Sequence, residues 1–146
     1  MIIPSSREVV LWYKQSITEV DTIIGSYVDL NVWKEGRELS KIIYQLTTQF
    51  PKAEQFGLTS QMRRAAISVT SNIAEGCGRN TANDCIRFYF ISRGSIYELE
   101  SQLYIAFDLD YIKQKQLEEI LDQIEKCRKL LNGFIKYYQN LAPKSK

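Results

Sequence analysis

Apolar side chains recur at intervals of three or four residues along most of the chain, which is the spacing of one face of an α-helix. Proline and glycine residues interrupt this pattern between segments. The pattern predicts no strands and five helical segments, at about residues 6–24, 32–50, 59–75, 83–108 and 113–140. The sequence therefore predicts an all-α fold.

The last four of these segments are amphipathic and joined by short loops. Helices connected in this way pack antiparallel to their neighbours, as an up-down four-helix bundle. We expect the bundle to span residues 27–141 and a short basic tail to follow at 142–146. Residues 1–26 either add a helix that packs on the bundle or form an extension, and the sequence leaves both alternatives open.

Composition excludes several kinds of chemistry. The chain has 146 residues, enough for one domain, and no histidine, which removes histidine-based triads and histidine-containing metal sites. Three cysteines are too few for a four-cysteine site, and their odd number fits a reducing compartment. Cys77 and Cys85 are expected on either side of one turn, where reduced thiols, a disulfide or half a metal site are all open. We expect no catalysis, metal or cofactor.

The sequence has no signal peptide and no run of roughly 18 apolar residues that could span a membrane, so we expect a cytoplasmic protein. The net charge of +2 is too small to predict nucleic-acid binding by itself. The charge is uneven, however, because residues 113–146 hold eight Lys or Arg and four Asp or Glu. A solvated tail explains this excess more simply than a phosphate-binding patch.

An aromatic stripe is predicted on the outer side of the fourth segment. Its members recur every seven residues: Phe90, Tyr97, Tyr104 and Tyr111. The opposite, core-facing side is expected to hold Phe88, Ser92, Ser95, Ile96, Leu99, Leu103 and Ala106. The stripe could be covered by the N-terminal segment, buried between subunits, or exposed for base stacking. We favour an oligomer interface, since tyrosine suits interfaces and monomers rarely expose such a stripe.

A polar stripe is predicted between the third and fourth segments. Its members on these two helices are Arg64, Ser68, Asn72, Glu75 and Glu98. If the two helices are antiparallel, facing residues have numbers that sum to about 162, which pairs Arg64 with Glu98, Ser68 with Gly94, and Glu75 with Arg87. We interpret the stripe as a structural network that fixes the helix register. The alternative is a polar groove in which Arg79 binds phosphate or carboxylate.

Several runs of the sequence resemble one family of bacterial proteins. They are YVDLNVWK at 27–34, GLTSQMRRAA at 57–66, SNIAEGCGR at 71–79 and RFYFISRGSIYELESQL at 87–103. The chain resembles, over about residues 27–141, the four-helix-bundle proteins encoded by intervening sequences of large-subunit ribosomal RNA genes. The resemblance implies a left-handed bundle that assembles as a ring-like homopentamer.

A relative of that family is the accessory variability determinant of diversity-generating retroelements, which binds nucleic acid and a reverse transcriptase. By this analogy the partners are copies of the chain itself, RNA or DNA, and a protein such as a reverse transcriptase. The candidate phosphate contacts are Arg79, Arg87, Arg93, Lys126, Arg128 and Lys129. The resulting hypothesis is a non-enzymatic oligomeric binding or scaffold protein that binds nucleic acid through basic surfaces. The alternative is a structural protein–protein adaptor that binds no nucleic acid.

Overall fold

The computed structural model describes residues 27–143. Within them lie two short 3₁₀ turns, η1 (Tyr27–Asp29) and η2 (Lys52–Glu54), and four helices: α2 (Asn31–Thr47), α3 (Leu58–Cys77), α4 (Ala82–Asp108) and α5 (Gln114–Leu141). This part of the chain contains no strand, and the predicted all-α class is confirmed. The segment predicted at 1–26 and the last three residues of the tail lie outside the described residues.

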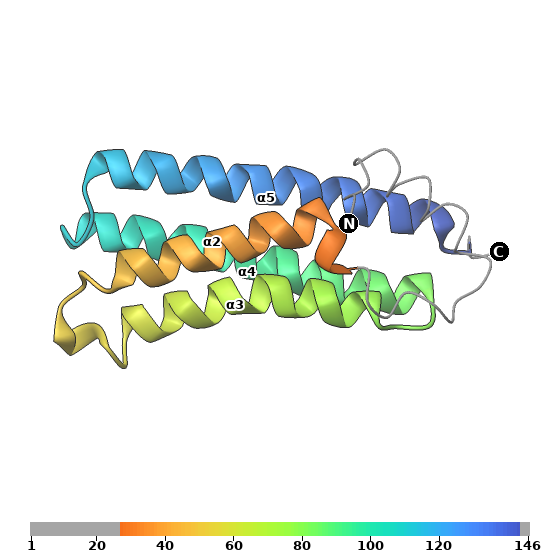
Figure 1. Ribbon diagram of the computed structural model, residues 1–146, viewed down its shortest axis with the longest axis horizontal. Helices are drawn as coiled ribbons and strands as arrows, with labels where there is room; N and C mark the ends of the chain where they lie inside the picture. Colours follow the sequence, from red (N-terminus) through yellow and green to blue (C-terminus); the bar gives the residue numbers. More distant parts are fainter. Residues whose placement is uncertain (1–26, 144–146) are drawn as a thin grey trace.

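The four helices run side by side along the long axis of the molecule (Figure 1). Contacts join α2 to α3, α3 to α4, α4 to α5 and α5 back to α2, so each helix packs against two neighbours around one core. Figure 1 shows α2 and α3 in the foreground, α4 behind them and α5 along the upper edge. This is the predicted four-helix bundle.

Most of the predicted core residues are buried. On α2, Leu39 and Ile43 have no exposed surface, and on α5 the same holds for Ile124 and Leu131. On α4 one core position differs from the prediction, because Tyr89 is fully buried while Phe88 is only half-buried. The Phe88 ring lies instead under two guanidinium groups, those of Arg79 at 4.3 Å and Arg87 at 5.4 Å from its centroid.

Capping groups explain where the helices begin. Thr81 precedes α4 and its hydroxyl accepts a hydrogen bond from the Asp84 amide at 3.2 Å, the N-cap expected for this residue type. α3 begins at Leu58, one residue ahead of the predicted start at about 59. The carboxylate of Glu54 caps this end, accepting a hydrogen bond from the Leu58 amide at 2.8 Å.

Close contact between α3 and α4 requires a glycine at position 76. A Cβ atom built at Gly76 would lie 2.4 Å from Cε1 of Tyr89 and 3.1 Å from the carbonyl oxygen of Cys85. Both distances are shorter than ordinary van der Waals contact, so any side chain here would push the helices apart or displace the buried Tyr89 ring. At Gly133 on α5, by contrast, a Cβ atom would meet nothing within 4 Å.

We expect Gly76→Ala to lower the free energy of unfolding by about 1–3 kcal/mol, because the added methyl group overpacks the α3–α4 contact. The matched control is Gly133→Ala, which we expect to raise stability by about 0.5–1 kcal/mol through helix propensity alone. Urea unfolding followed by circular dichroism measures both. Equal effects of the two substitutions would contradict the close contact at Gly76.

Candidate functional site

Three aromatic side chains point outward from α4 beside α5. Phe90, Tyr97 and Tyr104 are 38%, 51% and 48% exposed, and we call these three residues the aromatic row. Arginine guanidinium groups lie over two of the rings, with Arg93 4.8 Å from the Phe90 centroid and Arg128 5.1 Å from that of Tyr97. The row is therefore a surface of alternating rings and cations.

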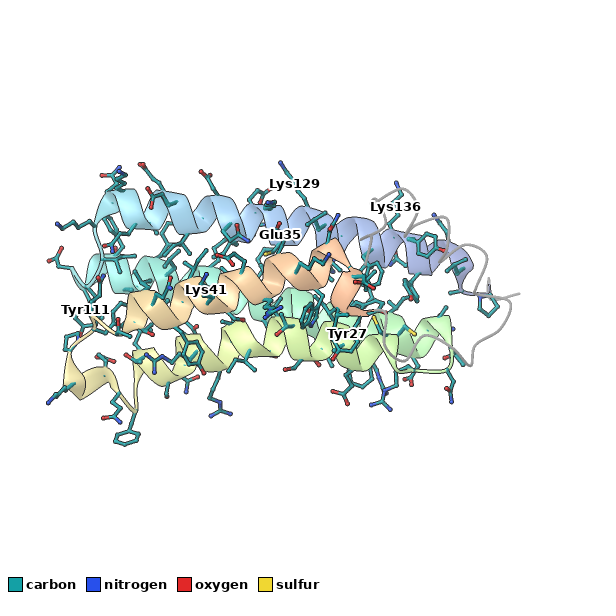
Figure 2. All side chains as sticks on the ribbon, in the orientation of Figure 1. Tyr27, Glu35, Lys41, Tyr111, Lys129 and Lys136 are labelled. Carbon is teal, nitrogen blue, oxygen red and sulfur yellow. The ribbon has the colours of Figure 1, made fainter. Side chains whose placement is uncertain are left out.

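Tyr111 does not belong to this row, so that part of the prediction is wrong. Its ring is half-buried and packs against Phe50, with centroids 5.4 Å apart. Its hydroxyl donates to Oε1 of Glu54 at 3.2 Å. Figure 2 shows it at the end of the bundle, near the connection between α2 and α3. The seven-residue spacing fails here because α4 ends at Asp108 and Tyr111 lies in the following turn.

A cluster of charges lies next to the aromatic row. Arg128 on α5 bridges to Oε2 of Glu100 on α4 at 2.7 Å, and it also pairs with Glu125 one turn earlier on its own helix. The hydrogen bonds that Arg128 donates to Glu125 and Glu100 raise the pKa of Arg128, and the same interaction lowers the pKa of Glu125. The Arg128 side chain is only 18% exposed. The two carboxylates therefore hold its guanidinium group in place over the Tyr97 ring.

Most of the cations predicted to contact phosphate already form ion pairs with carboxylates. Five of the six cations form ion pairs: Arg79 with Glu75 at 2.8 Å, Arg87 with Asp84 at 3.0 Å, Lys126 with Glu35 at 2.9 Å, Arg128 with Glu100 at 2.7 Å, and Lys129 with Glu125 at 3.8 Å. The sixth, Arg93, donates to Oδ1 of Asn132 at 3.3 Å. Phosphate binding by these residues stays a prediction, and it would have to compete with the paired carboxylates.

The seam between α3 and α4 holds a network of small polar groups. The Ser95 hydroxyl donates to Oγ of Ser68 at 2.8 Å, and Nδ2 of Asn72 donates to the same oxygen at 2.9 Å. The buried Ser92 hydroxyl donates to the carbonyl oxygen of Val69 at 2.7 Å. These pairs have the antiparallel register that the sequence predicted, with Ser95 rather than Gly94 opposite Ser68.

The predicted charged pairs across this seam do not form. Arg64 is exposed and has no hydrogen bond or ion pair within residues 27–143, while Glu98 accepts from Gln102 on its own helix at 3.2 Å. Glu75 pairs with Arg79 instead of Arg87. The physical reason is that small side chains close the seam, so the long charged ones extend to solvent. Glu75 and Glu98 there meet partners one turn away along the chain.

A Cβ atom at Gly94 would meet nothing within 4 Å, so this glycine does not contribute to the close approach of α3 and α4 as predicted. Its position is exposed. The small residues that allow the approach are Gly76, Ser68, Ser92 and Ser95.

A group of cations that sequence reasoning missed lies on α2 and α3. We call it the cationic face, and its members are Lys34, Arg37, Lys41, Arg63 and Arg64. Among the described residues none of them forms an ion pair with a carboxylate. The sequence signal is the spacing of the three α2 cations by three and four residues, outside the apolar stripe. Their combination with α3 needed the structure.

The three cysteines, all within residues 27–143, are buried and no disulfide joins them. Burial raises the pKa of Cys85 to about 11 and that of Cys127 to about 12. The Cys77 sulfur lies 3.5 Å from the hydroxyl oxygen of Tyr89. Of the alternatives at the turn, this arrangement matches reduced thiols packed in the core.

The described part of the chain offers little for catalysis or for a membrane. No group of three or more Cys, Asp or Glu in it is placed to hold a metal ion. A hollow of about 260 Å³ between α2 and α5 is lined by apolar residues and by Gln45, Gln49, Gln116 and Glu119, without a nucleophile beside a base. None of the helices in residues 27–143 is both long and apolar enough to cross a membrane.

We expect a double-mutant cycle of Arg128→Gln and Glu100→Gln to give a coupling energy of about 1 kcal/mol, since this pair is partly buried and bridges two helices. The comparison cycle is Arg64→Gln with Glu98→Gln, whose coupling should be zero within about 0.3–0.5 kcal/mol. Chemical unfolding of each variant supplies the energies. Strong coupling in the second cycle would restore the pairing predicted from the sequence.

We also expect Glu35 to make stability depend on pH. Hydrogen bonds from Lys126 and Gln123 lower the pKa of Glu35 below its ordinary value of 4.5. A carboxyl whose pKa is lower in the folded state stabilises the fold above its unfolded pKa, and this contribution disappears as the pH falls through the folded pKa. The stability difference between wild type and Glu35→Gln should therefore shrink between pH 6 and pH 3.

Thermal or urea unfolding across this pH range measures the effect. Glu38→Gln is the matched control, because Glu38 lies on the same helix without a hydrogen bond or ion pair among the described residues. If the stability difference between wild type and Glu35→Gln stays constant at all pH values, the contact of Glu35 with Lys126 and Gln123 is not formed in solution.

Comparisons with known proteins agree with the geometry. Residues 28–133 match the family described as 23S rRNA-intervening sequence protein. A solved structure of a protein with unknown function, from the S23 ribosomal protein family of Bacteroides thetaiotaomicron, is similar with a TM-score of 0.65 and 25% sequence identity, and the match covers 72% of this chain and 98% of that one. No curated protein matches the chain. Neither description names a catalytic activity. The resemblance seen in the sequence is confirmed, and the chain belongs to the 23S rRNA-intervening sequence protein family.

Proposed function

We propose that this protein is a non-enzymatic binding or scaffold protein that associates with copies of itself through the aromatic row. The observation that carries the proposal is the exposure of three large rings in one line along α4, with Tyr97 51% exposed. Monomers rarely expose a contiguous aromatic surface without a binding role. Tyrosine and arginine are the residues that interface centres favour, and here they alternate.

The surroundings of the row suit a protein contact. The ion pairs of Arg128 with Glu100 and Glu125 lie beside Tyr97 and would form a polar rim, already satisfied within the chain. Because these charges are paired, covering them would leave no isolated charge without a partner. The tyrosine rings would contribute buried area, and their hydroxyl groups could keep water or find partners in the second copy.

The symmetry of the assembly decides what the row contacts. In a two-fold dimer the row of one copy would face the row of the other, while in a ring it would face a different surface of the next copy. The ring of five copies that the family resemblance implies belongs to the second case. The measured mass distinguishes the two.

The absence of catalysis belongs to the same proposal. It is supported by the lack of histidine in the whole chain and by the pairing of the Glu75 and Glu100 carboxylates with arginines. The cytoplasm is the proposed location, which fits the three unbridged cysteines. As an adaptor, the oligomer would hold other proteins; as a nucleic-acid-binding protein, it would hold RNA or DNA. In both forms the oligomer would assemble through the aromatic row.

We expect the wild-type protein to show a mass of several times 17.0 kDa by light scattering, and the double variant Tyr97→Ser, Tyr104→Ser to dissociate toward the monomer. Removing two half-exposed rings should weaken association by at least tenfold, because aromatic side chains dominate interface energies. The measurement is multi-angle light scattering after gel filtration across a range of protein concentrations.

Tyr44→Ser is the matched control, since Tyr44 is 40% exposed on α2, away from the row, and should leave the mass unchanged. Circular dichroism confirms that the variants stay folded. A wild-type protein that is a monodisperse monomer at all concentrations would reject self-association. An oligomer that survives the double variant and dissociates with Tyr44→Ser would move the interface to α2.

A further inference from the structure

We propose that the cationic face of α2 and α3 binds a single-stranded nucleic acid, with phosphates on Arg37, Lys41 and Arg64 and a base against Tyr44. The inference names a partner class for the binding role proposed above and rests on that role, although it uses a different surface from the aromatic row.

The first argument is charge. Lys34, Arg37, Lys41, Arg63 and Arg64 have no carboxylate partner among residues 27–143, whereas three cations of α5 are paired: Lys126, Arg128 and Lys129. Glu38 is the one acid that α2 exposes among these cations. Figure 2 shows the other α2 carboxylate, Glu35, between α2 and α5, where it pairs with Lys126, while Lys41 lies on the exposed side of α2. α2 and α3 therefore carry five cations without a carboxylate partner, against one exposed acid on α2.

The second argument is the aromatic rings among these cations. The guanidinium group of Arg63 lies 4.6 Å from the centroid of Tyr44, and that of Arg37 lies 5.6 Å from the centroid of Trp33. Tyr44 is 40% exposed, so part of its ring remains accessible beside the arginine. Bases stack on tyrosine rings and on guanidinium planes, and phosphates bind the neighbouring cations. The face thus offers both kinds of contact that a single strand needs.

The third argument is rigidity. The Ser40 hydroxyl on α2 donates to the carbonyl oxygen of Ala66 on α3 at 3.1 Å, and Nε of Arg63 donates to the hydroxyl oxygen of Thr47 at 2.8 Å. A Cβ atom at Gly36 would lie 3.0 Å from the Thr70 methyl group, so the two helices are close there as well. These contacts hold the cations of both helices at fixed separations, which lowers the entropy lost on binding.

The aromatic rings among the cations distinguish a single strand from other anionic partners. A duplex keeps its bases stacked inside and would meet the cations through its phosphates alone, leaving Tyr44 unused. An acidic polypeptide would likewise use the cations without needing the rings. A single strand uses both, and it is the partner that the arrangement favours.

The test is fluorescence anisotropy of the full-length protein with a fluorescein-labelled single strand of mixed sequence, as RNA and as DNA. The variant Arg37→Gln, Lys41→Gln, Arg64→Gln removes three exposed cations without hydrogen bonds or ion pairs among the described residues. The matched control, Arg87→Gln, Lys126→Gln, Lys129→Gln, removes the same charge from ion-paired positions. We expect about a tenfold or greater loss of affinity in the first variant and little change in the second.

The salt dependence provides a second readout. Removing three phosphate contacts should lower the slope of log affinity against log salt concentration by about 2, given roughly 0.7 for each contact with a single strand. Tyr44→Leu should lower the affinity severalfold without changing this slope, because stacking is not electrostatic. Tyr44→Phe, which keeps the ring, should bind with an affinity close to that of the wild type.

Three results would overturn the inference: no binding at low salt, an equal loss in both triple variants, or competition by polyglutamate or duplex as strong as by the single strand. An equal loss of affinity would mean that the residues predicted from the sequence, such as those changed in the control, contribute as much to binding as the cationic face. Light scattering on the same samples keeps the two proposals apart. A monomer that binds RNA through α2 and α3 would reject self-association alone, and an oligomer that binds no strand would reject this inference alone.

Discussion

The close contact between α3 and α4 sets the geometry on which the other surfaces depend. Gly76 lets the Tyr89 ring pack against the backbone of α3, and Ser92 and Ser95 hydrogen-bond across the same seam. With small groups along the seam, the register of the two helices is fixed by steric fit and by short polar bonds. That register turns Phe90, Tyr97 and Tyr104 away from the core and toward the side of α5.

The same contact determines how the charges are distributed. Long charged side chains do not fit into the seam, so Arg64 and Glu98 extend into solvent instead of pairing. On the other side of α4, Glu100 lies within reach of α5 and pairs with Arg128. Glu125 pairs with Arg128 and Lys129 on α5, whereas Lys34, Arg37, Lys41, Arg63 and Arg64 on α2 and α3 have no carboxylate partner among the described residues. A weakly charged chain thus has one aromatic surface beside the ion pairs of Arg128 and one surface of cations without carboxylate partners.

How far the sequence could predict this differs from element to element. The helices of the described region, the core stripes of α2 and α5 and the Thr81 cap follow from local patterns, since each depends on residues three to four positions apart. Tyr111 was placed wrongly because the seven-residue spacing was extended to a residue beyond Asp108, where α4 ends and the helical spacing no longer applies. The Arg64–Glu98 pair was wrong because a register estimate gives neighbours along the seam but not the direction of long side chains.

The sequence by itself determined an all-α bundle, its family and the outward direction of the aromatic row, because apolar spacing and exclusion of polar groups from the core act within single helices. Only the tertiary structure decided which charges pair between helices. Ion pairs such as Lys126 with Glu35 join residues that are far apart in the chain, so their formation depends on how four helices pack. The positive surface on α2 and α3 consists of five cations that this packing leaves without a carboxylate partner among the described residues.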